Sequence, residues 1–285
     1  SSFDVPGSSG NAPTVKVTLV SDVTTLAFTS AGALLKIDAS FVAPKGTKHT
    51  ILGAISRDGC IGTSPDKFAI DTTQRMQIAM HDDLMNQLLY AIWYGGGMTM
   101  TIPGSELGGG SSTMGLSLEN ATLEVDLLLP PILEACNMAK PSMVRLQIGD
   151  ILSTLRVPFG SDEMALYLAT SLDVPAEIVF GKNSKGDAEV QVVPGKNLGM
   201  LIELTDISKT FASQKAAFSK LIKDMVAKEL AKGIPGGDQL KVPLPASETD
   251  LSSLAPGIPK GTVVKTVIKG LKRAGGYTAI SAALQ

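Results

Sequence analysis

MHDDLMNQLLYAIWYGGGMTMTI, residues 80–102, changes from a helical pattern to a strand pattern within one short stretch. Apolar residues recur every three to four positions in its first part, which predicts an amphipathic helix over Met80–Tyr94. The apolar stripe of this helix comprises Leu84, Met85, Leu88, Leu89 and Ile92. We expect Asp82 or Asp83 to cap the start, and the three glycines after Tyr94 to end it.

On both sides of this helix, apolar and polar residues alternate with the period of a β-strand. Met98, Met100 and Ile102 resume the alternation directly after the glycines. Strands are expected at residues 15–43, 51–55, 68–70, 98–102, 116–127, 144–157, 164–174, 178–193, 263–268 and 277–284. That is more strand than one flat sheet holds comfortably, so a curved sheet or a barrel is favoured.

A second amphipathic helix is predicted near the C-terminal third of the chain, over Ser213–Ala231. Its apolar side comprises Phe218, Leu221, Ile222, Met225, Val226 and Leu230, and lysines occupy the other side. This length suits a helix that lies along a long sheet. We expect an α+β fold with a single domain at 14–285, preceded by a linker or truncated end at 1–13 that is rich in glycine and serine.

The composition is apolar for a chain of this size, with 44% hydrophobic and 18% charged residues. No stretch approaches the roughly 20 apolar residues that span a bilayer, so the excess belongs to a large core, a lined cavity, or both. The net charge is −2 and the basic residues are scattered, which argues against nucleic acid as a partner. The one basic cluster, Lys269, Lys272 and Arg273, is interpreted as a solvated strand end.

Motifs for catalysis or for metal binding are not found in the sequence. Cys60 and Cys136 have no further Cys or His at zinc spacing, so either one disulfide or two buried free thiols fits them, and neither a metal nor another cofactor is expected. His49 is expected in a turn and His81 at a helix start, as a surface or capping residue. Gly181–Gly186 lacks the lysine of a phosphate loop, so we expect a hairpin turn there and a protein that is not an enzyme.

The order of several segments resembles that of the bactericidal/permeability-increasing protein and lipopolysaccharide-binding protein family, part of the tubular lipid-binding superfamily. The resemblance rests on the helix and strand of Met80–Ile102, then on LLLPPILEAC (127–136), RLQIGDILSTLRV (145–157) and KELAKGIPGGDQLKVPLP (228–245). It implies a strongly twisted antiparallel sheet or barrel wrapped around a long helix, with an apolar tunnel for acyl chains. The family's best-known members pair two barrels, and only one fits this chain.

Together these observations predict a protein that binds and transports a lipid and contacts a membrane surface transiently. The expected tunnel residues are Leu84, Met85, Leu88, Ile92, Met98, Met100, Phe218, Leu221, Ile222 and Met225. Methionine suits such walls because it is flexible and polarizable, although all of these residues could instead fill a solid core. A secreted, periplasmic or cell-envelope location is expected, with a second barrel domain or a homodimer partner. The alternative functions are a non-catalytic interaction module of a larger surface assembly and, less favoured, a hydrolase.

Overall fold

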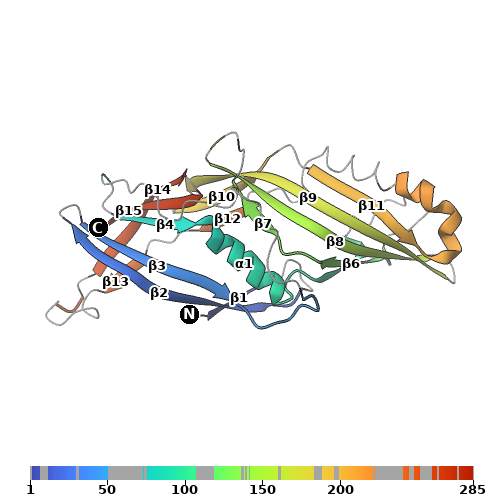
Figure 1. Cartoon of the computed structure of the whole chain (residues 1–285), viewed down its shortest axis with the longest axis horizontal. Helices are drawn as coiled ribbons and strands as arrows, with labels where there is room; N and C mark the ends of the chain where they lie inside the picture. The colour runs from blue at the N-terminus through green and yellow to red at the C-terminus, as the bar shows by residue number, and fades with distance from the viewer. Residues whose placement is uncertain are drawn as a thin grey trace.

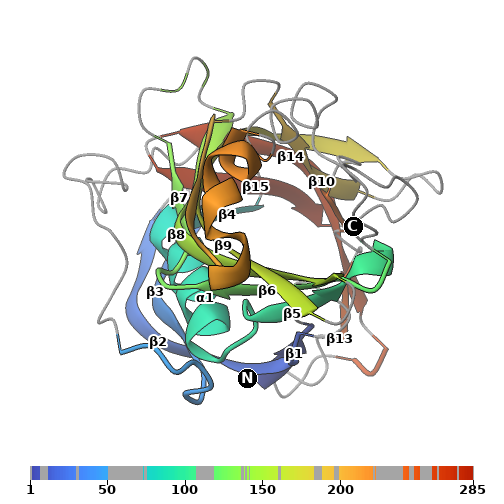
Figure 2. The same cartoon turned by 90° about the vertical axis from the view of Figure 1, so that its right-hand side faces the viewer.

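The computed structural model consists mainly of antiparallel β-strands arranged in three sheets (Figure 1). It describes residues 2–6, 12–29, 32–50, 73, 76–106, 119–135, 138, 140, 142–159, 162–182, 188–195, 199–220, 222, 240–243, 247–250, 259–261, 263–274 and 276–284. Figure 2 looks along the long axis of the molecule, with the sheets arranged around that axis.

The first sheet has three strands in the order β1 (Ser2–Val5), β2 (Val15–Thr29) and β3 (Gly32–Val42). The predicted strand region 15–43 is therefore confirmed as a long hairpin. A β-bulge shifts the register of that hairpin between Val23 and Thr25. Residues 2–5 were expected in a linker, and this expectation is corrected, because they pair with residues 15–18 of β2.

The second sheet has eight strands, and its longest members are β8 (Met143–Phe159) and β9 (Asp162–Lys182). The others are β5 (Met100–Pro103), β6 (Thr122–Leu127), β7 (Ile132–Glu134), β10 (Ala188–Pro194), β11 (Gly199–Ile207) and β12 (Leu240–Pro243). The strand break expected between 174 and 178 is not found, because β9 continues through Pro175. Proline is tolerated there because β10 pairs with β9 only from Ala176 onward and β11 only up to Asp173.

The third sheet has four strands in the order β13 (Ser247–Asp250), β14 (Val263–Ala274), β15 (Tyr277–Leu284) and β4 (Met76–His81). β14 is longer than predicted and ends at Ala274, so the basic cluster lies in its C-terminal half and reaches the strand end, as expected. Lys269 and Lys272 are exposed, but Arg273 is only 5% exposed. The interpretation of Arg273 as a solvated residue is therefore wrong.

Helix α1 covers Asp82–Tyr94, so the first predicted helix is confirmed with a start two residues later than expected. Met80 and His81 belong to β4, and the imidazole of His81, rather than either aspartate, caps the helix by accepting a hydrogen bond from the Asp83 amide. Gly95 ends the helix as predicted. One short 3-10 helix, η1 (Gly104–Glu106), follows β5.

The second predicted helix is described only in part. A 3-10 helix, η2 (Lys209–Gln214), leads into helical residues 215–220 and 222, at one end of the long axis (orange in Figure 1). The rest of Ser213–Ala231 lies outside the described residues, as do Cys60, Cys136 and the expected strands 51–55 and 68–70.

The observed fold is thus mostly antiparallel β with short helices. Within the described ranges the sheets are open and the α-helix α1 has only 13 residues, so a closed barrel around a long helix is not what these residues form. The sequence signal for strands was sound, but strand count alone cannot tell whether sheet edges meet.

Buried apolar residues form three separate clusters. The largest lies between the long strands of the second sheet and the helical segment after β11, and it contains Val157, Met164, Leu166, Leu168, Leu204, Ile207, Phe211, Phe218 and Ile222. The other two lie on opposite sides of α1, one around Val15 and Val17 and one around Trp93. Helix α1 is therefore where the sheets meet.

Candidate functional site

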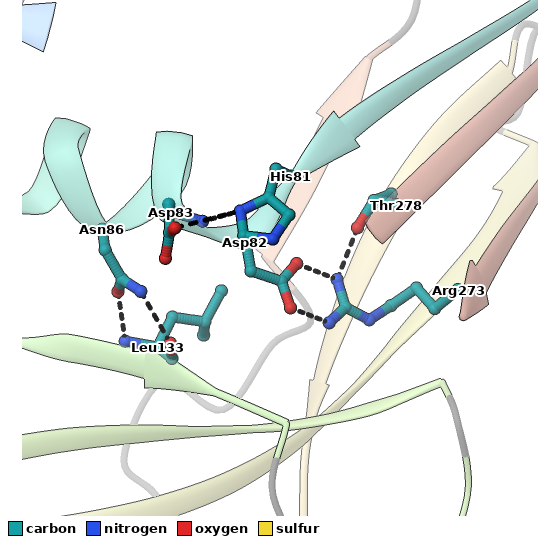
Figure 3. Close-up of polar contacts among 7 residues, drawn as sticks. All are labelled: His81, Asp82, Asp83, Asn86, Leu133, Arg273 and Thr278. Carbon is teal, nitrogen blue, oxygen red and sulfur yellow. Dashed lines mark hydrogen bonds and ion pairs between the residues drawn. The ribbon is translucent and has the colours of Figure 1, made fainter. Parts of the chain in front are cut away.

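Three polar contacts hold α1 against the sheets, each from a different turn of the helix. Asp82 binds Arg273 of β14, Asn86 binds the backbone of Leu133 in β7, and the Trp93 indole donates to the Leu127 carbonyl at 2.7 Å. Figure 3 shows the first two contacts, with the Asn86 amide bonded to both the N–H and the carbonyl of Leu133. The position of α1 is thus fixed by specific bonds as well as by packing.

The pair between Asp82 and Arg273 is buried and bidentate. Nη1 of Arg273 lies 2.9 Å from Oδ1 of Asp82, and Nη2 lies 2.7 Å from Oδ2. The same guanidinium donates to the Thr278 hydroxyl, and the Asp82 amide donates to the Gly276 carbonyl at 2.8 Å. Two planar groups bonded in this way hold the start of α1 in one orientation over the third sheet.

The end of α1 approaches another backbone segment very closely. The amides of Gly46 and Thr47 both donate to the Tyr94 carbonyl, at 2.9 and 3.0 Å. A Cβ atom at Gly46 would overlap the carbonyl oxygen of Gly95, so only glycine allows this approach. The segment after β3 is therefore tied to the C-terminus of α1.

The hairpin β2–β3 has one apolar face and one charged face, and the bulge keeps both continuous. Cross-strand partners share a face, and the partners Val23 and Ile37 on one side of the bulge are followed by Leu26 and Leu35 on the other. This face, called the hairpin face below, comprises Phe3, Val5, Val15, Val17, Leu19, Val23, Leu26, Phe28, Ala33, Leu35, Ile37, Ala39 and Phe41, together with the uncharged Ser21 opposite Ala39. All charged residues of the three strands lie on the opposite face.

Helix α1 covers only one end of the hairpin face. Val15 and Val17 are 3% and 0% exposed and pack with Ala91, Leu88 and Ile92 of α1. Toward the hairpin tip the same face is uncovered, and the exposed fractions there are 63% for Val23, 58% for Leu26, 77% for Phe28, 51% for Leu35 and 52% for Ile37. A run of exposed apolar side chains of this kind commonly marks a binding surface.

The third sheet has an apolar face of its own, called the sheet face below. Its strand register puts Met76, Ile78, Met80, Ile268, Leu271, Ile280 and Ala282 on one side. Arg273 and Thr278 are partners on this same side, so the bond from Arg273 to Asp82 places α1 over the sheet face. Ile78 is 51% exposed, which means that this face is also not fully covered.

The two apolar faces therefore converge on α1 from different sheets. Figure 1 shows α1 between the hairpin and β4 of the third sheet, consistent with contacts of the helix to β2, β3 and β4. Beyond the helix, Leu26, Leu35 and Ile37 of the hairpin face and Ile78 of the sheet face belong to none of the three buried clusters. We take these two faces, with α1 between them, as the candidate site.

The residues predicted to line a tunnel are divided among different places. Leu88 and Ile92 pack under the hairpin face, Met98 packs in the cluster of Trp93, and Phe218 and Ile222 are buried in the cluster of the second sheet. Leu84, Met85 and Met100 are half-buried, and Leu221 and Met225 lie outside the described residues. Among the described residues, those of the two predicted helices thus fall in different buried clusters.

Both histidines have structural partners. His49 stacks on Trp93 with ring centroids 6.3 Å apart, and its Nε2 lies 2.9 Å from Oδ1 of Asp126. Burial on its own would raise the pKa of Asp126, but hydrogen bonds and charges from Lys48 and His49 outweigh burial and lower that pKa. His81 caps α1, and its ring meets the edge of Tyr277.

Within the described part of the chain, no three His, Cys, Asp or Glu residues lie where they could hold a metal ion. Nor does any helix in that part have the length and apolarity to cross a bilayer.

The exposed residues of the two faces were not among the site residues predicted from the sequence. Their alternation was legible in 15–43, but the bulge at Thr24 interrupts it between Val23 and Leu26. A search for apolar alternation that allows one inserted residue would have found the hairpin face.

Comparison with known proteins adds no assignment. No protein-family model matches the chain, and no curated protein matches it significantly.

Proposed function

We propose that this protein binds an apolar ligand, an acyl chain of a lipid, on the hairpin face and sheet face beside α1. The observation that carries the proposal is the exposure of Leu26, Leu35, Ile37 and Ile78, each more than half exposed, on two faces that converge on one helix. Soluble domains usually bury such a surface or use it for binding.

The chemistry of the two faces fits a ligand without polar groups along its length. All charged residues of β1–β3 lie on the opposite face, and the charge that Arg273 brings to the sheet face is already paired with Asp82. Removing an acyl chain from water gains about 0.8 kcal/mol per methylene, so about 15 carbons offer on the order of 10 kcal/mol before ordering costs. No directional recognition is needed for binding of this kind.

Membership of the tubular lipid-binding superfamily, transient contact with a membrane, and a secreted, periplasmic or cell-envelope location remain parts of this proposal. They are supported by the order of segments around Met80–Ile102 and by the antiparallel strands that follow α1. The interaction module is the alternative, because a protein partner could cover the same exposed side chains.

Lipid extraction tests the proposal. The purified chain is extracted with organic solvent, the extract is analysed by mass spectrometry, and a fluorescent fatty acid is titrated into the delipidated protein. We expect a stoichiometric lipid in the extract or saturable uptake of the fluorescent probe. If the extract contains no lipid and the protein takes up no probe, the proposal is overturned in favour of the interaction module.

Three matched variants place the ligand. Leu26→Asp on the hairpin face and Ile78→Asp on the sheet face should each weaken uptake of the fatty acid by at least about tenfold, because they put a charge against the acyl chain. Leu201→Asp is the control, since Leu201 is 71% exposed on the face of β11 opposite the buried Leu204. Equal effects in all three variants would contradict the placement.

A further inference from the structure

We propose that two copies of this chain associate through the free edge of β3, pairing antiparallel around Ile37 in a symmetric dimer. β3 is an edge strand in the order β1-β2-β3, and in the described part of the chain it pairs only with β2. It is 11 residues long, which makes it a large open edge, and open edges readily accept another strand. This inference does not depend on lipid binding.

The backbone of β3 fixes which residues can pair outward. The Lys36 carbonyl accepts a hydrogen bond from the Thr24 hydroxyl, so it points toward β2. Neighbouring residues in a strand direct their N–H and carbonyl groups to opposite sides, so those of Leu35, Ile37 and Ala39 point to the free edge. In an antiparallel pair of Ile37 with Ile37 of the second copy, the backbone N–H of each isoleucine would donate a hydrogen bond to the carbonyl of the other.

The charges of β3 are self-complementary in this one register. With Ile37 on the symmetry axis, Lys36 lies opposite Asp38 of the second copy, and Asp38 lies opposite its Lys36. These pairs are of the type in which side chains approach most closely, and opposite charges at such positions attract. A shift of one residue along the strand would lose both pairs.

The single chain leaves these charges unmatched. Asp38 is directly opposite Asp22 in the hairpin, and two like charges at such positions repel each other. Within the described residues, neither aspartate forms an ion pair, and neither does Lys36. Lys36 of a second copy would supply the missing cation beside the two aspartates.

The apolar side chains of β3 would also contact those of the second copy. In the same register Ile37 meets its symmetry mate and Leu35 meets Ala39, all on the hairpin face. Ile37 and Leu35 are 52% and 51% exposed in the single chain, so pairing would remove part of this apolar surface from water. The two hairpin faces would then form one continuous surface.

Sedimentation velocity of the full chain over a range of concentrations tests the dimer, with circular dichroism to check folding. We expect a reversible monomer–dimer equilibrium. Lys36→Asp and Asp38→Lys should each weaken dimerisation by about tenfold, because each places like charges opposite one another twice in the dimer. The double variant Lys36→Asp/Asp38→Lys should restore the dimer of the unaltered chain.

A fourth variant tests the backbone pairing. Ile37→Pro removes an N–H that points away from β2, so the hairpin should keep its own hydrogen bonds while the dimer is lost. A chain that stays monomeric at every concentration overturns the proposal. A dimer that is unchanged by the single charge variants or by Ile37→Pro also overturns it, because association would then use another surface.

Discussion

Asp82, the first residue of α1, and Arg273, the last residue of the basic cluster of β14, form a bidentate ion pair across 191 positions of the chain. Their side chains are 4% and 2% exposed. This pair holds the start of α1 over the sheet face, and the arrangement of both apolar faces depends on that position.

Removal of one partner of this pair should destabilise the protein strongly. Asp82→Asn leaves Arg273 buried without a counter-charge, and we expect a loss of about 3–5 kcal/mol in the free energy of unfolding. Urea denaturation followed by circular dichroism measures it. The control is Asp83→Asn, because the Asp83 side chain is half-exposed. This variant should lose less than about 1 kcal/mol in the free energy of unfolding. Equal losses in the two variants would show that the buried pair has no special role.

Because Gly46 lies so close to the end of α1, adding one methyl group at this position should destabilise the fold. Gly46→Ala should lower the free energy of unfolding by about 1–3 kcal/mol, because the added Cβ overlaps the backbone of Gly95. Gly270→Ala is a matched control, since a Cβ there meets nothing within 4 Å. If thermal unfolding showed the same midpoint for both variants, the tie between residue 46 and α1 would be refuted.

Trp93 is the single tryptophan and reports directly on α1. It is 2% exposed and its indole donates to the Leu127 carbonyl, so its fluorescence should be blue-shifted and resistant to iodide quenching. Trp93 lies in a different cluster from Val15 and Val17, so ligand binding on the hairpin face should change this emission little. Ready quenching in the native state would contradict the docking of α1.

The pKa of Asp126 predicts a dependence of stability on pH. Its lowered pKa means that the ionised carboxylate is favoured by folding, so its contribution is present above the ordinary pKa of about 4 and is lost as the pH falls through the lowered value. Asp126→Asn should therefore be less stable than the unaltered chain at pH 7, and the difference should shrink on acidification. Urea titrations at several pH values measure it, and a difference that grows in acid would be the wrong sign.

Local patterns predicted the elements of this fold better than their relationships. Alternation found β2, β3, β8 and β15, and helical spacing found α1, because both depend on neighbouring residues alone. The start of α1 was misplaced because His81 can both end a strand and cap a helix.

Contacts distant in sequence decided the features that could not be predicted. The burial of Arg273 depends on Asp82, which follows a different strand, and the continuity of β9 through Pro175 depends on where β10 and β11 stop. The exposure of Leu26 and Leu35 depends on how far α1 reaches along the hairpin. None of these is encoded in the spacing of nearby residues.

The most direct test of ligand binding on the two faces is photo-crosslinking with a fatty acid that carries a diazirine near its methyl end. Mass spectrometry of the digested protein then locates the labelled residues. We predict labels on the hairpin face and sheet face, around Leu26, Leu35, Ile37 and Ile78. Labels concentrated around Leu201 of the second sheet would contradict the prediction. Labelling that excess unlabelled fatty acid fails to suppress would contradict it as well.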